Sequence, residues 1–163
     1  MKLDRPLAIL VVDDEPAKRK AIADCIAKAI QPLPDFSEAA SFESATRILK
    51  ERSFDWVILD MRITTYDVSP SDRGGRPRNL GGDEVLRRMA RRGMKAKVVV
   101  VTQYSIFRDR NRVLTTNQLV ERLRARYSGF VGLVELRHKS DAWEEDLIAY
   151  ILAGQEMVDV PHN

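Results

Sequence analysis

Short apolar runs alternate along the chain with longer segments whose apolar residues recur at helical spacing. The runs cover residues 7–12, 36–40, 55–61, 96–102 and 130–136. Runs of this length, rich in β-branched residues, are typical of strands buried on both faces of a parallel sheet. Because parallel strands need crossover helices of one hand, the alternation predicts a doubly wound α/β domain.

Helix starts and stops can be placed from local signals. Helices are predicted to begin at Pro16, at Ser41 or Glu43, at Asp83 after the pair Gly81-Gly82, at Thr115 or Thr116, and at Ser140 or Asp141. The first is predicted to end near Pro32, the third at Gly93 and the fifth at Gly154. Cys25 lies on the apolar stripe of the first helix, which predicts a core position.

Two stretches, residues 62–80 and 103–114, show neither helical nor strand periodicity. Loops this long in a compact domain are usually functional or disordered. Each follows a predicted strand, so both are expected to lie together over one edge of the sheet. Their arginines would then form a basic rim able to bind phosphate or carboxylate groups, unless they are simply solvated: Arg62, Arg73, Arg76, Arg78, Arg108, Arg110 and Arg112.

Composition narrows the class of protein. The 163 residues are 44% hydrophobic and 31% charged, as in a globular protein, and the length predicts one domain spanning residues 1–163. No apolar run reaches the roughly 20 residues of a membrane span, and the first residues lack a signal peptide's apolar core, so we expect a cytoplasmic protein. One cysteine excludes an internal disulfide. Residues 87–97 are basic and residues 141–159 are acidic. This uneven distribution is typical of solvated helix faces, and it could also steer a charged partner toward the protein.

Polar residues follow the ends of four predicted strands. Asp13 and Asp14 follow the first, Asp60 ends the third, Thr102 ends the fourth and Lys139 comes after the fifth. Asp often ends a strand merely as a turn residue. However, ligands of open parallel sheets bind beyond the carboxyl ends of the strands, and these groups would share that edge.

This set of side chains supports phosphoryl chemistry. Asp13, Asp14 and Asp60 would repel one another unless a cation lay among them, and their oxygen ligands favour Mg²⁺. Asp60 would attack phosphorus as a carboxylate nucleophile and form an acyl phosphate. Mg²⁺ and Lys139 would neutralise the transferring oxygens, and the hydroxyl of Thr102 would donate a hydrogen bond to one of them.

The order Asp13-Asp14, Asp60, Thr102, Lys139 resembles the receiver domain of two-component response regulators, over roughly residues 7–153. The resemblance implies the flavodoxin-like sheet order 2-1-3-4-5, a histidine kinase or phosphotransfer protein as phosphodonor, and a requirement for Mg²⁺. It further implies that Asp14, Asp60 and the backbone carbonyl of Arg62 ligate the metal directly, with Asp13 acting mainly through water.

The chain departs from the usual receiver pattern at three positions. Leu136 stands where an aromatic residue is usual, Ser140 stands where a proline with a cis bond follows the lysine, and Thr64 replaces a further proline. A non-proline cis bond costs about 2.5 to 4 kcal/mol, so the geometry of the Lys139–Ser140 bond is left open.

Several functions are compatible with these residues. The leading hypothesis is a stand-alone receiver, with no output module after the fifth helix, that signals through a downstream protein partner; a homodimer is left open. The main alternative is a receiver-like interaction module that is rarely or never phosphorylated. An aspartate-nucleophile phosphatase is disfavoured because Arg62 stands where its general acid would be, so the chain is not expected to be an enzyme beyond self-phosphorylation and self-dephosphorylation. A dinucleotide-binding fold is disfavoured because the chain lacks the glycine motif that follows the first strand of such folds. No recognisable motif supports nucleic-acid binding.

Overall fold

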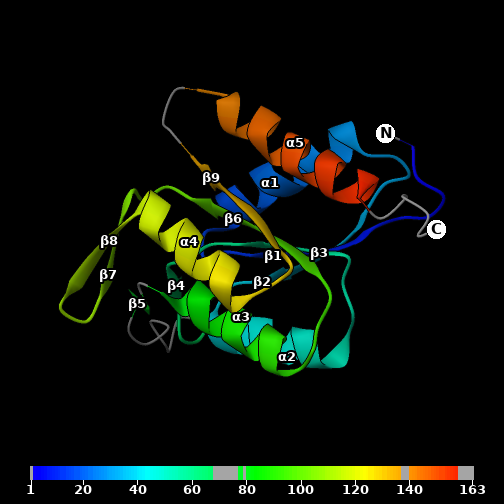
Figure 1. The fold of residues 1–163 in the computed structure, drawn as a ribbon. Helices are drawn as coiled ribbons and strands as arrows, with labels where there is room; N and C mark the ends of the chain where they lie inside the picture. Colours follow the sequence, from blue (N-terminus) through cyan, green and yellow to red (C-terminus); the bar gives the residue numbers. More distant parts are fainter. Residues whose placement is uncertain (1, 68–76, 79, 137–139, 158–163) are drawn as a thin grey trace.

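A five-stranded parallel sheet forms the centre of the molecule (Figure 1). The computed structural model describes residues 2–67, 77–78, 80–136 and 140–157. In sheet order the strands are β2 (Asp35–Ala39), β1 (Ala8–Val12), β3 (Trp56–Leu59), β6 (Lys97–Thr102) and β9 (Phe130–Glu135). The predicted doubly wound fold and its strand order are therefore confirmed. All carboxyl ends meet at one edge of the sheet, since every pairing within it is parallel.

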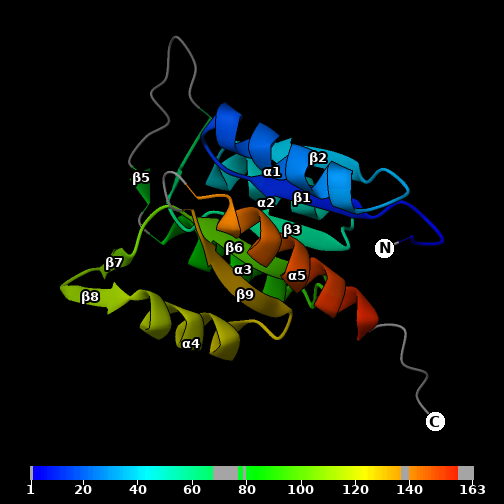
Figure 2. The same ribbon diagram turned by 90° about the horizontal axis from the view of Figure 1, so that it is seen from above.

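Helices cover both faces of the sheet (Figures 1 and 2). One face carries α1 (Pro16–Ala29) and α5 (Ala142–Glu156), and the other carries α2 (Phe42–Glu51), α3 (Gly81–Arg91) and α4 (Thr116–Arg126). Each strand contributes alternate side chains to two buried apolar clusters, one on each face. None of the helices in the described part of the chain has the length and apolar character that crossing a bilayer requires.

Local capping fixes most helix ends where the sequence predicted them. Ser41 and Thr115 each cap a helix through a reciprocal capping box, in which the side chain accepts a hydrogen bond from the third backbone N–H. Gly93, at φ +64°, takes the left-handed conformation that follows α3. Cys25 is buried on α1, as predicted.

Two helix boundaries differ from the prediction because close packing, and not capping, requires glycine there. Gly81 and Gly82 form the first turn of α3 and do not merely precede it. Gly154 does not end α5, which continues to Glu156. A Cβ on Gly154 would lie 2.5 Å from the ring of Trp56, so this glycine lets the helix pack on the central strand.

The stretch 103–114 is not irregular as predicted. It contains a hairpin of β7 (Ile106–Asp109) and β8 (Arg112–Thr115), joined through Arg110 at φ 54°. Phe107 and Leu114 face each other across the hairpin and are buried in the cluster beneath α3 and α4. The sequence shows no clear alternation of apolar and polar residues here, because each strand buries only one side chain.

The stretch 62–80 also contains more order than predicted. β4 (Ile63–Thr64) pairs antiparallel with β5 (Pro77–Arg78), and the side chain of Ile63 is fully buried. The predicted rim residues Arg73 and Arg76 lie outside the described residues.

Candidate functional site

The three predicted carboxylates meet at the carboxyl edge of the sheet. The backbone N–H of Asp13 donates to the carbonyl of Ala39 on β2 at 3.0 Å, and the backbone N–H of Asp60 donates to the carbonyl of Val12 on β1 at 3.0 Å. These bonds extend the strand ladders by one residue and hold both side chains at the sheet edge. Ligand oxygens of Asp13, Asp14 and Asp60 all lie within 4.8 Å of one another. Asp13 and Asp60 are buried, whereas Asp14 is exposed.

A lysine that the sequence reading did not single out lies among these carboxylates. The Nζ of Lys18 lies 2.5 Å from Asp13 Oδ2 and 3.1 Å from Asp60 Oδ2. It also donates to the backbone carbonyl of Val101 on β6 at 3.0 Å, and the residue is only 7% exposed. One ammonium group therefore contacts the ends of β1, β3 and β6.

The helical stripe of α1 carried a signal for this position. The buried residues of α1 are Lys18, Ile22, Cys25 and Ile26. Extending the apolar stripe back by one turn from Ile22 leads to Lys18, a lysine on the face of the helix that packs on the sheet. A charged residue on a core-facing stripe needs a buried partner.

Charge and burial shift the protonation equilibria of this cluster. Burial raises the pKa of Asp60 to about 6, although the positive charge of Lys18 opposes the rise. Burial alone would lower the pKa of Lys18, but the charges of Asp60 and Asp13 outweigh it and raise that pKa. Burial, followed by the charge of Asp13, raises the pKa of Asp14. The three carboxylates outnumber the ammonium that pairs with them, so the cluster favours an added cation.

The donor set suits Mg²⁺ by its chemistry. It offers oxygen atoms from three carboxylates, which is the ligand type that this ion prefers, and the exposure of Asp14 leaves a route for a hydrated ion. Some oxygens are already hydrogen-bonded: Asp13 Oδ1 accepts from the N–H of Glu15 at 2.9 Å, and Asp60 Oδ1 accepts a long bond from the N–H of Arg62 at 3.4 Å. A metal at these carboxylates would therefore meet oxygens that Lys18 and two backbone N–H groups already contact.

The remaining predicted site residues are placed unevenly. Thr102 is fully buried at the end of β6, and its Oγ1 accepts a hydrogen bond from the N–H of Tyr104 at 3.2 Å. Arg62 places its guanidinium 5.1 Å from the centre of the Tyr104 ring. Leu136 packs against the apolar cluster beneath α1 and α5. Lys139, and with it the Lys139–Ser140 bond, lies outside the described residues.

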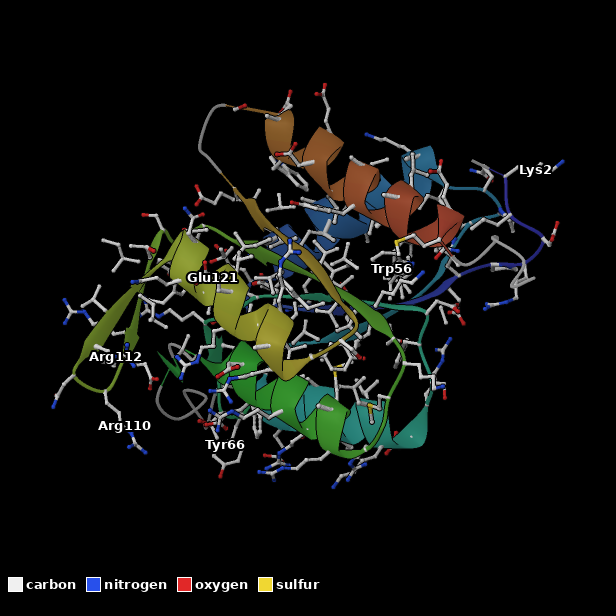
Figure 3. All side chains as sticks on the ribbon, viewed as in Figure 1. Lys2, Trp56, Tyr66, Arg110, Arg112 and Glu121 are labelled. Carbon is white, nitrogen blue, oxygen red and sulfur yellow. The ribbon has the colours of Figure 1, made fainter. Side chains whose placement is uncertain are left out.

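The arginines of the hairpin lie beside α3 and α4. Arg108, Arg110 and Arg112 line a hollow together with Asp83 and Arg122, and the three site aspartates are not among the described residues that line it. Figure 3 shows Arg110 and Arg112 extending from the hairpin away from the sheet. Phe107 and Leu114 fix the hairpin to the cluster beneath α3 and α4, and the predicted rim around the carboxylates stays a prediction.

A buried carboxylate links α3 to α4 next to this hollow. Asp83 is 3% exposed, and its oxygens lie 3.1 Å from Arg126 Nε, 3.7 Å from Arg87 Nε and 3.8 Å from Arg122 Nε. Burial raises the pKa of Asp83, while the three arginines oppose the rise, Arg126 most strongly. Arg122 also pairs with Asp109 at 2.6 Å, which ties the hairpin to α4.

Two known proteins are similar in sequence to most of this chain. No family model matches the chain. The Detocs response regulatory protein DtcB of Enterobacter cloacae (strain JD6301) is 30% identical over 148 residues, which cover 89% of this chain and 98% of that protein. The uncharacterized protein y4jR of Sinorhizobium fredii (strain NBRC 101917 / NGR234) is 30% identical over 136 residues, covering 82% and 87%.

Solved structures show the same fold at low identity. The receiver domain of NtrX from Brucella abortus superposes with a TM-score of 0.61 at 19% identity, covering 91% of this chain and 98% of that one. A CheY-like receiver domain protein from Methanospirillum hungatei JF-1 gives 0.60 at 16%, covering 94% and 96%. The relative that matches along nearly its whole length is a response regulatory protein, and the fold is that of a receiver. The chain therefore belongs to the response-regulator receiver family.

Proposed function

We propose that this chain is a phospho-accepting receiver, with a receiver unit over residues 7–153, and that Asp60 is its phosphoacceptor. A carboxylate oxygen of Asp60 forms the new P–O bond while the P–N bond of a phosphohistidine donor breaks, and the bonding pair returns to the imidazole nitrogen. Asp13, Asp14, Asp60 and the backbone carbonyl of Arg62 are the proposed metal ligands. A bound Mg²⁺ would offset the charge that builds up on the transferring oxygens.

The convergence of three carboxylates at the carboxyl edge of the sheet carries this proposal. Such a cluster is unfavourable without a cation, which suits a site that binds Mg²⁺ together with phosphoryl oxygens. Asp60 ends the central strand β3 and so lies between the carboxylates of β1 and the hydroxyl of Thr102 on β6. Thr102 and Lys139 are proposed to contact the phosphoryl group.

Intact mass measurement after incubation with acetyl phosphate and Mg²⁺ tests the assignment. The wild type should gain one phosphoryl mass and Asp60→Asn none. Asp24→Asn, which changes an exposed carboxylate on α1, is the matched control and should be phosphorylated like the wild type. Full modification of Asp60→Asn would show that another residue accepts the group.

A second function is favoured by one specific contact. Because Lys18 already pairs with Asp60, the carboxylate can be held as a structural ion pair in a receiver-like module that binds its partner without phosphorylation. Leu136, in place of the usual aromatic residue, favours the same function. Wild-type protein that gains no mass from acetyl phosphate or from a phosphorylated histidine phosphotransfer protein would support this alternative.

The proposed partners follow from phosphoryl acceptance. A histidine kinase or phosphotransfer protein in the cytoplasm would supply the phosphoryl group, and a downstream protein would bind the phosphorylated form. The DtcB relative is a response regulatory protein, which supports a signalling role for this chain.

A further inference from the structure

Lys18 lies on the buried face of α1, where the other buried side chains belong to the core. It lies one turn before Ile22, at the start of the buried stripe, and its Nζ contacts Asp13 and Asp60 at the carboxyl edge of the sheet. The neighbouring lysine, Lys20, is exposed and pairs with Asp24 in solvent at 2.6 Å. Lys18 and Lys20 thus differ completely in environment although they lie on the same helix, and burial of Lys18 is not a general property of this surface.

Three oxygen atoms surround the buried ammonium of Lys18. Its Nζ donates hydrogen bonds to Asp60 Oδ2 and to the carbonyl of Val101, and it forms an ion pair with Asp13 Oδ2 at 2.5 Å. Two of these neighbours carry negative charge, which offsets the cost of removing the ammonium from water. The group is therefore held at the centre of the proposed phosphorylation site, where it neutralises part of the carboxylate charge.

A divalent ion at the same carboxylates conflicts with this arrangement. Asp13 and Asp60 belong both to the proposed metal site and to the contacts of Lys18. Two cations only a few ångströms apart repel strongly in a buried site, where water screens them poorly. Each carboxylate oxygen that turns toward the ammonium is also lost as a metal ligand. Simultaneous full occupancy by the ammonium and the metal is therefore unfavourable.

We propose that Lys18 is a built-in counter-ion of the acidic pocket that competes with the divalent ion, so that the ion binds only as the Nζ of Lys18 leaves Asp13 and Asp60. The inference rests on the proposed function in that it concerns the same carboxylates. It adds a residue that sets the affinity for the metal. It also couples occupation of the site to a movement of a side chain on α1.

Calorimetric titration of the metal-free protein with MgCl₂ provides the first test. Lys18→Met keeps the length and apolar part of the side chain but removes the charge, and it should bind Mg²⁺ at least about tenfold more tightly than the wild type because competition is lost. Lys20→Met removes a charge from the same helix at an exposed position and should bind like the wild type. An unchanged dissociation constant in a folded Lys18→Met protein overturns the proposal.

Amine labelling of the wild type provides a second test that needs no variant. A succinimidyl ester should modify Lys18 slowly in metal-free protein, because the amine is buried, and several-fold faster at saturating Mg²⁺, because the ion displaces it. Lys20 and Lys28 on the same helix serve as internal controls whose rates should not change. Mass spectrometry of peptides gives the rates. Labelling of Lys18 that does not respond to saturating Mg²⁺ overturns the proposal even if Lys18→Met fails to fold.

The outcomes separate this inference from the proposed function. Wild-type protein that becomes phosphorylated on Asp60, with equal Mg²⁺ affinity in wild type and Lys18→Met, overturns the competition alone. Tighter Mg²⁺ binding in Lys18→Met, with no phosphorylation of the wild type, supports the competition and overturns phosphorylation alone. If the wild type binds no Mg²⁺ while Lys18→Met does, exclusion by Lys18 is supported. If neither binds, both the competition and the metal site are refuted.

Discussion

Replacement of Gly82 by alanine would test how rigidly the fold holds Asp60. Gly82 lies in the first turn of α3, and its N–H donates to the carbonyl of Met61 at 3.0 Å. A Cβ at this position would lie 2.4 Å from Met61 Cε, 2.7 Å from the backbone oxygen of Asp60 and 3.0 Å from Met61 Cα. The start of α3 therefore rests directly on the backbone of the proposed phosphoacceptor.

The size of the effect follows from these contacts. Ordinary contact begins at 3.4 Å, so the Asp60 oxygen at 2.7 Å is about 0.7 Å too close to the new methyl group. The methyl of Met61 belongs to a fully buried side chain, and the Asp60 oxygen belongs to the backbone, so neither can move freely. Overpacking of this kind costs about 1–3 kcal/mol, and alanine recovers up to about 1 kcal/mol as a better helix former. We expect Gly82→Ala to lower the free energy of unfolding by about 1–2 kcal/mol.

The assay combines urea unfolding with the initial rate of phosphorylation by acetyl phosphate. Gly93→Ala, just beyond the other end of α3, is the matched control. A Cβ added at Gly93 would meet no atom within 4 Å, so the substitution should cost only the strain of a φ of +64°, about 1–2 kcal/mol. Both variants should lose similar stability, but only Gly82→Ala should also lose rate, by about tenfold or more, because small misplacements of reacting groups are costly. Wild-type stability and rate in Gly82→Ala, or an equal loss of rate in Gly93→Ala, would refute the reasoning.

Two further predictions concern buried carboxylates. In metal-free buffer, folding raises the pKa of Asp60 from its ordinary value of 3.8 to about 6. The stability of the wild type relative to Asp60→Asn should therefore be greatest below about pH 4. It should fall as the pH rises through 6, by up to about 3 kcal/mol. A difference in unfolding free energy that does not change with pH would contradict this. Asp83→Ala should lower the free energy of unfolding in urea by about 2 kcal/mol, less than for a fully buried pair because its arginine partners are partly exposed. Asp24→Ala, an exposed control, should change the free energy of unfolding by less than about 0.5 kcal/mol. An equal loss in both variants would show that Asp83 stabilises the fold no more than an exposed carboxylate does.

The sequence alone determined the sheet, its helices and the convergence of the carboxylates. Apolar runs separated by helical stripes leave few arrangements other than a parallel sheet with crossovers. Once the strands are parallel, residues that follow them share one edge, so Asp13, Asp14 and Asp60 could be grouped without coordinates. Capping residues such as Ser41 and Thr115 act over only three residues, so the helix starts could also be predicted from the sequence.

Tertiary structure alone decided the features that depend on distances between elements remote in sequence. Lys18 is 42 residues from Asp60 and 83 from Val101, so only the docking of α1 on the sheet brings its ammonium to both. The need for glycine at position 82 arises from contact between α3 and the backbone after β3. The hairpin arginines lie beside α3 and α4 because two buried side chains, Phe107 and Leu114, anchor the hairpin there. Local patterns fix what each element is, whereas packing between elements fixes which side chains meet.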